Sequence, residues 1–202
     1  MVEPMENGPI TPQEMAEIRR LMLDSAIPGP KTVHAMAGIP GAGKTTFAVR
    51  AMGDGRFPKG AFILNPDRVM EALPRYRADY VNWGPQKAFD KWEMPARELA
   101  YAMSQEAADR GLPIVKDMGM VRDENWEMLQ GFKNRGYAIH LHVISCPLET
   151  AMAACAERAR FFPLEQIAER AAALEQFLGQ YAHIPDSITR YERRDHDFIQ
   201  LG

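Results

Sequence analysis

Residues 38–45 carry the clearest chemical pattern in the sequence. They read Gly-Ile-Pro-Gly-Ala-Gly-Lys-Thr and match the phosphate-binding loop G-x-x-x-x-G-K-[ST] at every fixed position. Glycines let the backbone wrap around an anion, and the positive end of the helix that follows adds to the same site. Lys44 can reach the β- and γ-phosphates of a nucleotide, and the Thr45 hydroxyl can bind Mg²⁺. The predicted nucleotide-binding residues are Gly38, Pro40, Gly41, Ala42, Gly43, Lys44, Thr45 and Thr46.

The surroundings of this loop favour phosphate binding over a purely structural turn. A glycine-rich segment can also join a strand to a helix without binding any ligand. Here the loop follows a short apolar run at 32–37 and precedes a helical pattern at 44–52. A strand before the loop and a helix after it are the context that the motif requires.

Two acidic residues follow predicted strands further along the chain. Asp67 lies in the turn Asn65-Pro66-Asp67, after a predicted strand at 61–64. A carboxylate at this place can accept the proton of an attacking hydroxyl, as a general base does in phosphoryl transfer. It can equally cap a helix that starts at Arg68, and position alone does not separate the two roles.

Asp117 is the second acid and follows a predicted strand at 113–116. An acid at the end of an apolar strand can hold Mg²⁺ in nucleotide-binding proteins, usually through a water. A solvated carboxylate at a strand end is the alternative interpretation. The phosphate loop upstream favours the metal role for Asp117, together with Thr45.

Two arginines, Arg158 and Arg160, precede Pro163 between two predicted helices. If the segment 156–163 closes over a nucleotide as a lid, their guanidinium groups can bind phosphate oxygens and stabilise transition-state charge. The alternative is a basic helix end exposed to solvent, which the helix dipole favours. The pattern of residues leaves both interpretations open.

The elements that must position these side chains alternate between short strands and helices. Thr11 and Glu14 form a capping-box pattern at the start of the first predicted helix. Strands are predicted at 32–37, 61–64, 113–116, 138–144 and within 187–201, and helices at 11–27, 44–52, 95–109, 122–134, 148–158 and 164–178. This alternation predicts a mostly parallel sheet of about five strands with helices on both faces. Ligands bind such sheets at the carboxyl ends of the strands, where the loop and both acids fall.

We therefore predict an α/β fold of the P-loop NTPase type, a three-layer sandwich with a short arginine-bearing lid. The 202 residues are enough for a single domain, with residues 1–10 as a loose arm. A net charge of −3 gives no global attraction to nucleic acid or anionic lipid. No apolar run is long enough to span a bilayer. Two cysteines without a signal-peptide pattern indicate a cytoplasmic protein.

His140 and His142 lie in the strand predicted at 138–144 and share one of its faces. Two imidazoles can begin a metal site, but no third ligand is in view. A structural role for these histidines is therefore favoured.

The combined motifs resemble the zeta-toxin family of P-loop kinases. The resemblance runs from about residue 31 to about residue 175. The motifs that carry it are residues 38–46, Asn65-Pro66-Asp67, Asp117, Gly136-Tyr137 before a strand, and Arg158 and Arg160 before Pro163. The Asn-Pro-Asp turn followed by Leu73-Pro74-Arg75-Tyr76 is more specific to the family than the phosphate loop, and so is the Arg-x-Arg-x-x-Pro segment.

This resemblance implies a kinase that uses ATP and Mg²⁺ to phosphorylate a hydroxyl of a nucleotide sugar such as UDP-N-acetylglucosamine. It implies that Asp67 is the base, that Lys44 binds phosphate, and that Arg158 and Arg160 are catalytic lid residues. It also raises an antitoxin protein as a binding partner.

Three functions are compatible with these observations. The first is an ATP-dependent kinase acting on a hydroxyl of a small molecule, with Glu93 and Arg97 binding the acceptor beside Asp67. The second is a polynucleotide 5′-hydroxyl kinase, which would need a basic track for the phosphate backbone, and no strong basic cluster lies outside the lid. The third is an ATP-binding interaction module, which would need no base facing the γ-phosphate.

Overall fold

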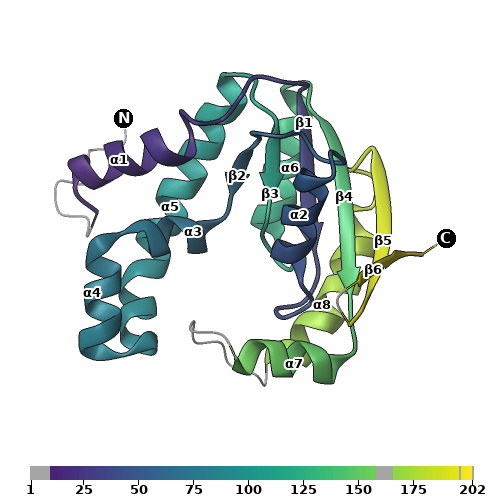
Figure 1. The fold of residues 1–202 in the computed structure, drawn as a ribbon. Helices are drawn as coiled ribbons and strands as arrows, with labels where there is room; N and C mark the ends of the chain where they lie inside the picture. Colours follow the sequence, from purple (N-terminus) through teal and green to yellow (C-terminus); the bar gives the residue numbers. More distant parts are fainter. Residues whose placement is uncertain (1–9, 158–165, 196, 202) are drawn as a thin grey trace.

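The computed structural model describes residues 10–157, 166–195 and 197–201 (Figure 1). The helices are α1 (Pro12–Met22), α2 (Lys44–Gly53), α3 (Pro66–Ala72), α4 (Pro74–Trp83), α5 (Pro85–Asp109), α6 (Asp123–Asn134), α7 (Leu148–Ala156) and α8 (Gln166–Tyr181). The strands are β1 (Thr32–Ala37), β2 (Phe62–Leu64), β3 (Ile114–Lys116), β4 (Ala138–Ser145), β5 (Ser187–Arg194) and β6 (Asp197–Gln200). The predicted lid residues Arg158 and Arg160 lie outside the described residues.

These strands join one sheet in the order β2-β3-β1-β4-β5-β6. The first five pair in parallel, and β6 runs antiparallel to β5 at the edge. The predicted, mostly parallel sheet is confirmed, and the tail at 187–201 adds two strands where one was expected. Because β1 lies between β3 and β4, the chain order reverses around β1, which is where such sheets bind ligands.

Helices cover both faces of the sheet and complete a three-layer α/β sandwich of the P-loop type (Figure 1). Side chains of β1 alternate between two cores. Val33 and Ala35 face the larger core, which includes Trp126 of α6, whereas Met36 faces the smaller core with Phe47 of α2. The sheet is therefore buried on both faces, as its apolar strands predict.

Helix α5 starts at Pro85, so the predicted start at Pro95 is wrong. Proline is common at the first helical position, where its missing N–H would have no partner in any case. Pro85 occupies that position, and Pro95 lies inside the helix. The helix therefore also includes residues 85–94, several of which are polar.

Residues 66–83 form two helices, α3 and α4, of which only a helix starting at Arg68 was considered from the sequence. The Asn65 side-chain oxygen caps α3 by accepting hydrogen bonds from the backbone N–H groups of Asp67 and Arg68, at 2.9 and 3.4 Å. The proposal that Asp67 itself caps a helix starting at Arg68 is therefore wrong. Asp67 lies instead in the first turn of α3.

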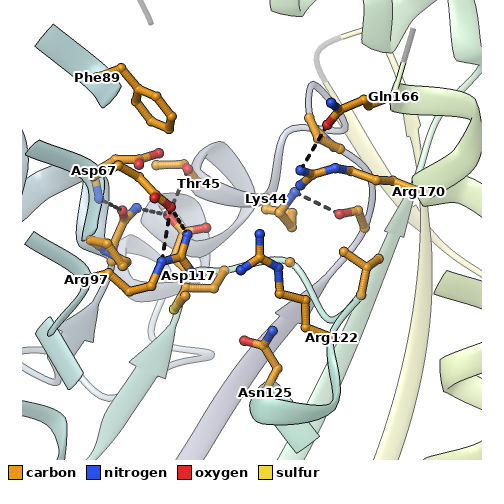
Figure 2. A pocket seen from close by; sticks show the side chains of 18 of the residues that line it. Lys44, Thr45, Asp67, Phe89, Arg97, Asp117, Arg122, Asn125, Gln166 and Arg170 are labelled. Atoms are coloured by element: carbon orange, nitrogen blue, oxygen red, sulfur yellow. Dashed lines mark hydrogen bonds and ion pairs between the residues drawn. The ribbon is translucent and has the colours of Figure 1, made fainter. Parts of the chain in front are cut away.

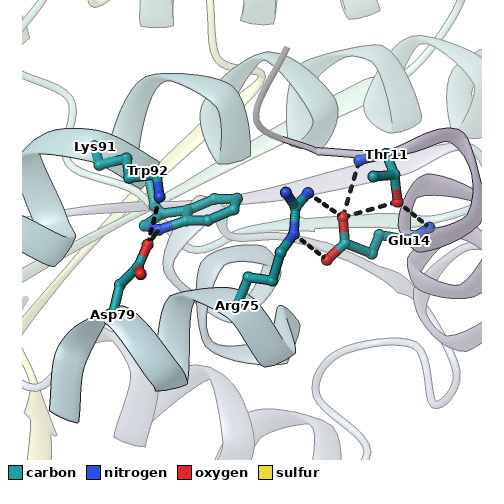
Figure 3. Close-up of polar contacts among 6 residues, drawn as sticks. All are labelled: Thr11, Glu14, Arg75, Asp79, Lys91 and Trp92. Atoms are coloured by element: carbon teal, nitrogen blue, oxygen red, sulfur yellow. Dashed lines mark hydrogen bonds and ion pairs between the residues drawn. The ribbon is translucent and has the colours of Figure 1, made fainter. Parts of the chain in front are cut away.

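Helix α1 ends at Met22, before the predicted 27, and contacts the α4–α5 pair (Figure 3). Its capping box is confirmed, because Thr11 and Glu14 exchange backbone-to-side-chain hydrogen bonds at 2.9 and 3.3 Å. Arg75 of α4 donates from Nε to Glu14 at 2.9 Å and lies over the Trp92 ring of α5. Hydrogen bonding from Arg75 is the main cause that lowers the pKa of Glu14 to about 2.

The strand histidines pack in the smaller core beneath α2. His34 Nδ1 lies 3.1 Å from His142 Nε2, and the His34 ring stacks on Phe57. Among residues 10–157, 166–195 and 197–201, no group of three or more His, Cys, Asp or Glu side chains could hold a metal. His142 is 8% exposed and packs beside the Phe47 ring, which supports the structural role favoured for it, whereas His140 Nδ1 lies 2.9 Å from the Ser187 hydroxyl oxygen.

Candidate active site

The phosphate loop joins β1 to α2 and is packed so tightly that glycine is required at two positions. At Gly41, where φ is 85°, an added Cβ would lie 2.2 Å from the Ala151 carbonyl oxygen of α7. At Gly38 it would lie 2.5 Å from the Ile144 carbonyl oxygen of β4. No side chain fits at these distances, so the glycines allow the loop to lie directly on its neighbours.

Two cations contact this loop. The Lys44 ammonium donates to the carbonyl oxygens of Gly38 and Ile39, both at 2.9 Å. Arg193 of β5 donates to the Gly41 carbonyl oxygen at 3.2 Å. Together with the positive end of α2, these groups make the loop a favourable place for phosphate oxygens.

Asp117, Thr45 and Asn65 form a hydrogen-bonded cluster beside the loop. One oxygen of Asp117, Oδ2, accepts from the Thr45 hydroxyl at 2.7 Å and from the Asn65 amide at 2.9 Å. The sheet order explains this meeting, because β3 lies between β2 and β1 and the chain after each strand reaches the same edge. Asp117 is only 7% exposed, so the solvated carboxylate proposed as an alternative is wrong.

The oxygen atoms in this cluster fit Mg²⁺. Mg²⁺ usually takes one or two carboxylates, keeps several waters and completes its shell with substrate phosphates. Asp117 and Thr45 supply oxygen ligands next to the loop where phosphates would bind. A site with few protein ligands is therefore the kind that a nucleotide can complete.

A cavity of about 400 Å³ opens between the loop and helix α5 (Figure 2). We call its two sides the loop wall and the α5 wall. The loop wall consists of Gly38, Pro40, Lys44 and Thr45, and the α5 wall consists of Gln86, Phe89, Asp90, Glu93 and Arg97. Asp67 of α3 and Asp117 after β3 also line the cavity but belong to neither wall. Further lining comes from Asn65, Pro66, Met118, Gly119, Val121, Arg122, Asn125, Gln166 and Arg170.

Glu93 and Arg97 pair on the α5 wall. Arg97 Nε donates to Glu93 Oε1 at 3.1 Å, and Arg97 Nη1 donates to the Tyr101 hydroxyl at 3.3 Å. Their side chains are 21% and 16% exposed, which leaves part of each open to the cavity. A carboxylate and a guanidinium held together in this way can accept from, and donate to, a polar ligand.

A buried lysine lies behind the lining at the end of β3. Lys116 is fully buried and donates from Nζ to Asn125 Oδ1 at 2.7 Å and to the Met120 sulfur at 3.3 Å. Burial, reinforced by the charge of Arg97, lowers the pKa of Lys116 to about 7. From the sequence, Lys116 was predicted only as a strand residue.

The structure gathers most of the predicted site residues around one cavity. Gly41, Ala42, Gly43 and Thr46 belong to the phosphate loop or to α2 but do not line the cavity. Those that line it are Gly38, Pro40, Lys44, Thr45, Asp67, Glu93, Arg97 and Asp117.

Several lining residues were missed from the sequence. Gln86, Phe89 and Asp90 share a helical face with Glu93 and Arg97, at spacings of three and four residues. That periodicity would have revealed them if α5 had been predicted to start at Pro85. Arg170 of α8 and Asn125 of α6 give no comparable signal, because only the fold brings them to the cavity.

Comparison with solved structures shows a shared fold. A structure of the PezAT chromosomal toxin–antitoxin system of Streptococcus pneumoniae matches with a TM-score of 0.74 at 18% identity, over 94% of this chain and 81% of that chain. The AvrRxo1-ORF1:AvrRxo1-ORF2 complex matches in a structure with ATP, with a TM-score of 0.61 at 15% identity. This second match covers 94% of the present chain. It covers only 63% of the AvrRxo1 chain, which is less than two thirds of that chain's length.

No curated protein matches the sequence. None of the helices in the described part of the chain combines the length and hydropathy needed to cross a membrane.

A family model described as Zeta toxin matches residues 22–200, and this family together with the P-loop fold supports a nucleotide-binding, kinase-like function. Because the match spans most of the sequence and includes both walls of the cavity, the chain belongs to the zeta toxin family.

Proposed function

We propose that this protein is an ATP-dependent kinase that transfers the γ-phosphoryl group to a hydroxyl of a small molecule. One observation carries the proposal: a carboxylate, Asp67, lines the same cavity as the phosphate loop residues Lys44 and Thr45. A protein that only bound ATP would not need an acid opposite its phosphate loop. A cavity of about 400 Å³ suits a small acceptor.

The residues divide the reaction between them. Asp67 accepts the proton of the acceptor hydroxyl as its oxygen bonds to the γ-phosphorus, while the bond from phosphorus to the β–γ bridging oxygen breaks and ADP leaves. Lys44 stabilises the charge of the transferring group. Thr45 and Asp117 would hold Mg²⁺, which supplies charge neutralisation at the phosphates when bound. Arg158 and Arg160 are proposed to act from the lid, and Arg170 adds a cation that already lines the cavity.

The family suggests the acceptor and a partner. We propose a sugar nucleotide such as UDP-N-acetylglucosamine as acceptor, with Glu93 and Arg97 contacting its polar groups. The PezAT structure is described as a toxin–antitoxin system, which supports an antitoxin protein as a partner of this chain. The mixed charges of the α5 wall do not favour a polynucleotide acceptor, because a phosphate backbone requires a basic track.

The test is an ATP-consumption screen against sugar nucleotides, nucleosides, amino sugars and 5′-hydroxyl oligonucleotides. It includes Asp67→Asn and a control, Asp54→Asn, which changes an acid outside the cavity that hydrogen-bonds to Arg56. We expect turnover with one class of acceptor, a loss of about 10²–10⁴-fold in Asp67→Asn, and no loss in the control. ATP binding without turnover on any compound would contradict the kinase proposal and favour an interaction module.

A further inference from the structure

Asn125 and Lys116 form a buried pair at the margin of the cavity. Asn125 lies in the first turn of α6, is 3% exposed and lines the cavity (Figure 2). Lys116, at the end of β3, is fully buried. The 2.7 Å hydrogen bond from Lys116 Nζ to Asn125 Oδ1 joins the two elements.

This contact fixes which end of the Asn125 amide faces the ligand. A lysine ammonium has only donors, so it can bond the amide oxygen but not the amide nitrogen. The two ends of the amide point in opposite directions, and Oδ1 is held by Lys116. In the described part of the chain Nδ2 has no protein partner, and it is not a buried orphan, so its protons open onto the cavity.

We infer that Asn125 is an acceptor-binding residue that donates from Nδ2 to an oxygen of the phosphoryl acceptor, and that Lys116 is the positioning residue that fixes its orientation. This inference rests on the proposed kinase function. The group recognised is an oxygen other than the attacking hydroxyl: a carbonyl, carboxylate, phosphate or second hydroxyl oxygen. Compounds without such an oxygen in reach are disfavoured, because binding them would bury an unpaired donor.

A flipped amide would recognise the opposite chemistry. If Oδ1 faced the cavity, Asn125 would select a donor such as an amine or an amide N–H. Lys116 opposes this flip, because a flip would set its ammonium against the amide N–H₂ and leave only the weakly accepting Met120 sulfur as a partner. The flipped orientation also loses the 2.7 Å hydrogen bond of a fully buried group, so the observed orientation is the more stable one.

The experiment compares wild type with Asn125→Asp, Asn125→Ala, Lys116→Met and the double variant Asn125→Ala/Lys116→Met. Asn125→Asp keeps a partner for Lys116 but replaces the donor with an acceptor-only group. The matched control is Asn134→Asp, at an exposed position on the same helix. The first probe is UDP-N-acetylglucosamine, replaced by the fastest compound of the acceptor screen if it is not turned over. Thermal unfolding and ATP affinity report folding.

We expect Asn125→Asp to raise the acceptor KM about tenfold or more, while kcat and ATP affinity change by less than about twofold. Lys116→Met should raise the acceptor KM in an otherwise intact protein and add nothing in the Asn125→Ala background, because it acts through that amide. An unchanged acceptor KM in folded Asn125→Asp would overturn the inference. So would a Lys116→Met effect that persists in full without Asn125, since Lys116 would then act by another route. A wild type inert toward every compound would instead refute the proposed function on which this inference depends.

Discussion

The two walls of the cavity are built in different ways. The loop wall depends on backbone groups and glycines in one short stretch, where Gly38 and Gly41 press against neighbouring carbonyl oxygens. The α5 wall depends on side chains, such as the paired Glu93 and Arg97, projected from a helix packed on α3 and α4. The first wall suits phosphate, which any nucleotide carries, and the second suits one particular acceptor.

This contrast indicates where specificity resides. A backbone cradle cannot change its chemistry without losing its shape, so it serves a constant part of the reaction. Side chains on a helix can be exchanged one by one while the helix stays in place. Changes in the loop wall should therefore affect all acceptors equally, and changes in the α5 wall should affect acceptors selectively.

The largest effect is expected from Lys44→Met in the loop wall. Loss of the ammonium should lower kcat/KM about 10²–10³-fold on every accepted compound, because the charge acts on the transferring phosphoryl group. Steady-state kinetics on two acceptors would measure it, with the exposed Lys59→Met as control. A loss confined to one acceptor would break the proposed division between the walls.

The next effect is a loss of protein stability at low pH, caused by histidines packed beneath α2, the helix that follows the phosphate loop. Burial is the main cause that lowers the pKa of His34 to about 4 and of His142 to about 3, below the ordinary value of 6.5. The folded state thus binds fewer protons than the unfolded chain, so stability is complete above about pH 6.5 and falls as the pH drops toward 4. The loss should reach several kcal/mol in the free energy of unfolding at pH 4, because one pKa unit corresponds to about 1.4 kcal/mol.

Denaturant unfolding between pH 4 and pH 7 checks this expectation. His142→Phe keeps a flat ring beside Phe47 and removes a buried Nδ1 that has no partner in the described part of the chain. In His142→Phe the free energy of unfolding should fall less steeply between pH 7 and pH 4 than in wild type. The exposed control His183→Gln should behave like wild type. An equally steep loss in His142→Phe would show that other groups destabilise the protein in acid.

A smaller and selective effect is expected from Glu93→Gln in the α5 wall. It removes the charge that pairs with Arg97, so the acceptor KM should rise about tenfold, while ATP affinity stays unchanged. Kinetics with varied acceptor, beside calorimetry with ATP, separate the two quantities. Glu98→Gln, exposed on the same helix, is the control. Weaker ATP binding in Glu93→Gln would mean that the walls do not act separately.

The smallest effect is expected from Glu14→Gln, behind the α5 wall. Arg75, which pairs with Glu14, has a side chain that is 46% exposed, and ion pairs this open contribute about 0.2–1 kcal/mol. Thermal unfolding should show a small drop, on the order of a few degrees at most. Glu17→Gln on the same helix should show none. A large drop would mean that α1 is essential to the position of α4 and α5.

Prediction from sequence succeeded where short segments fix their own structure. The capping box of Thr11 and Glu14, the strand at 32–37 and the loop at 38–45 were all predicted at their observed places. Each depends on contacts within a few residues. The start of α5 was wrong because Pro95 was predicted as the first helical residue, whereas Gly84, at a φ of 85°, separates α4 from α5 and puts Pro85 at that position.

By itself, the sequence determined the phosphate loop, the alternation of strands and helices, and the acids that follow β2 and β3. These features are local, since glycine torsions, strand periodicity and turn residues act over short distances along the chain. The tertiary structure alone decided that Asp117 meets Thr45 and Asn65, that Glu93 and Arg97 face the loop, and that Lys116 fixes Asn125. Those contacts depend on strand order and on helix packing against the sheet, which join residues far apart in the sequence and follow from burial of the whole core.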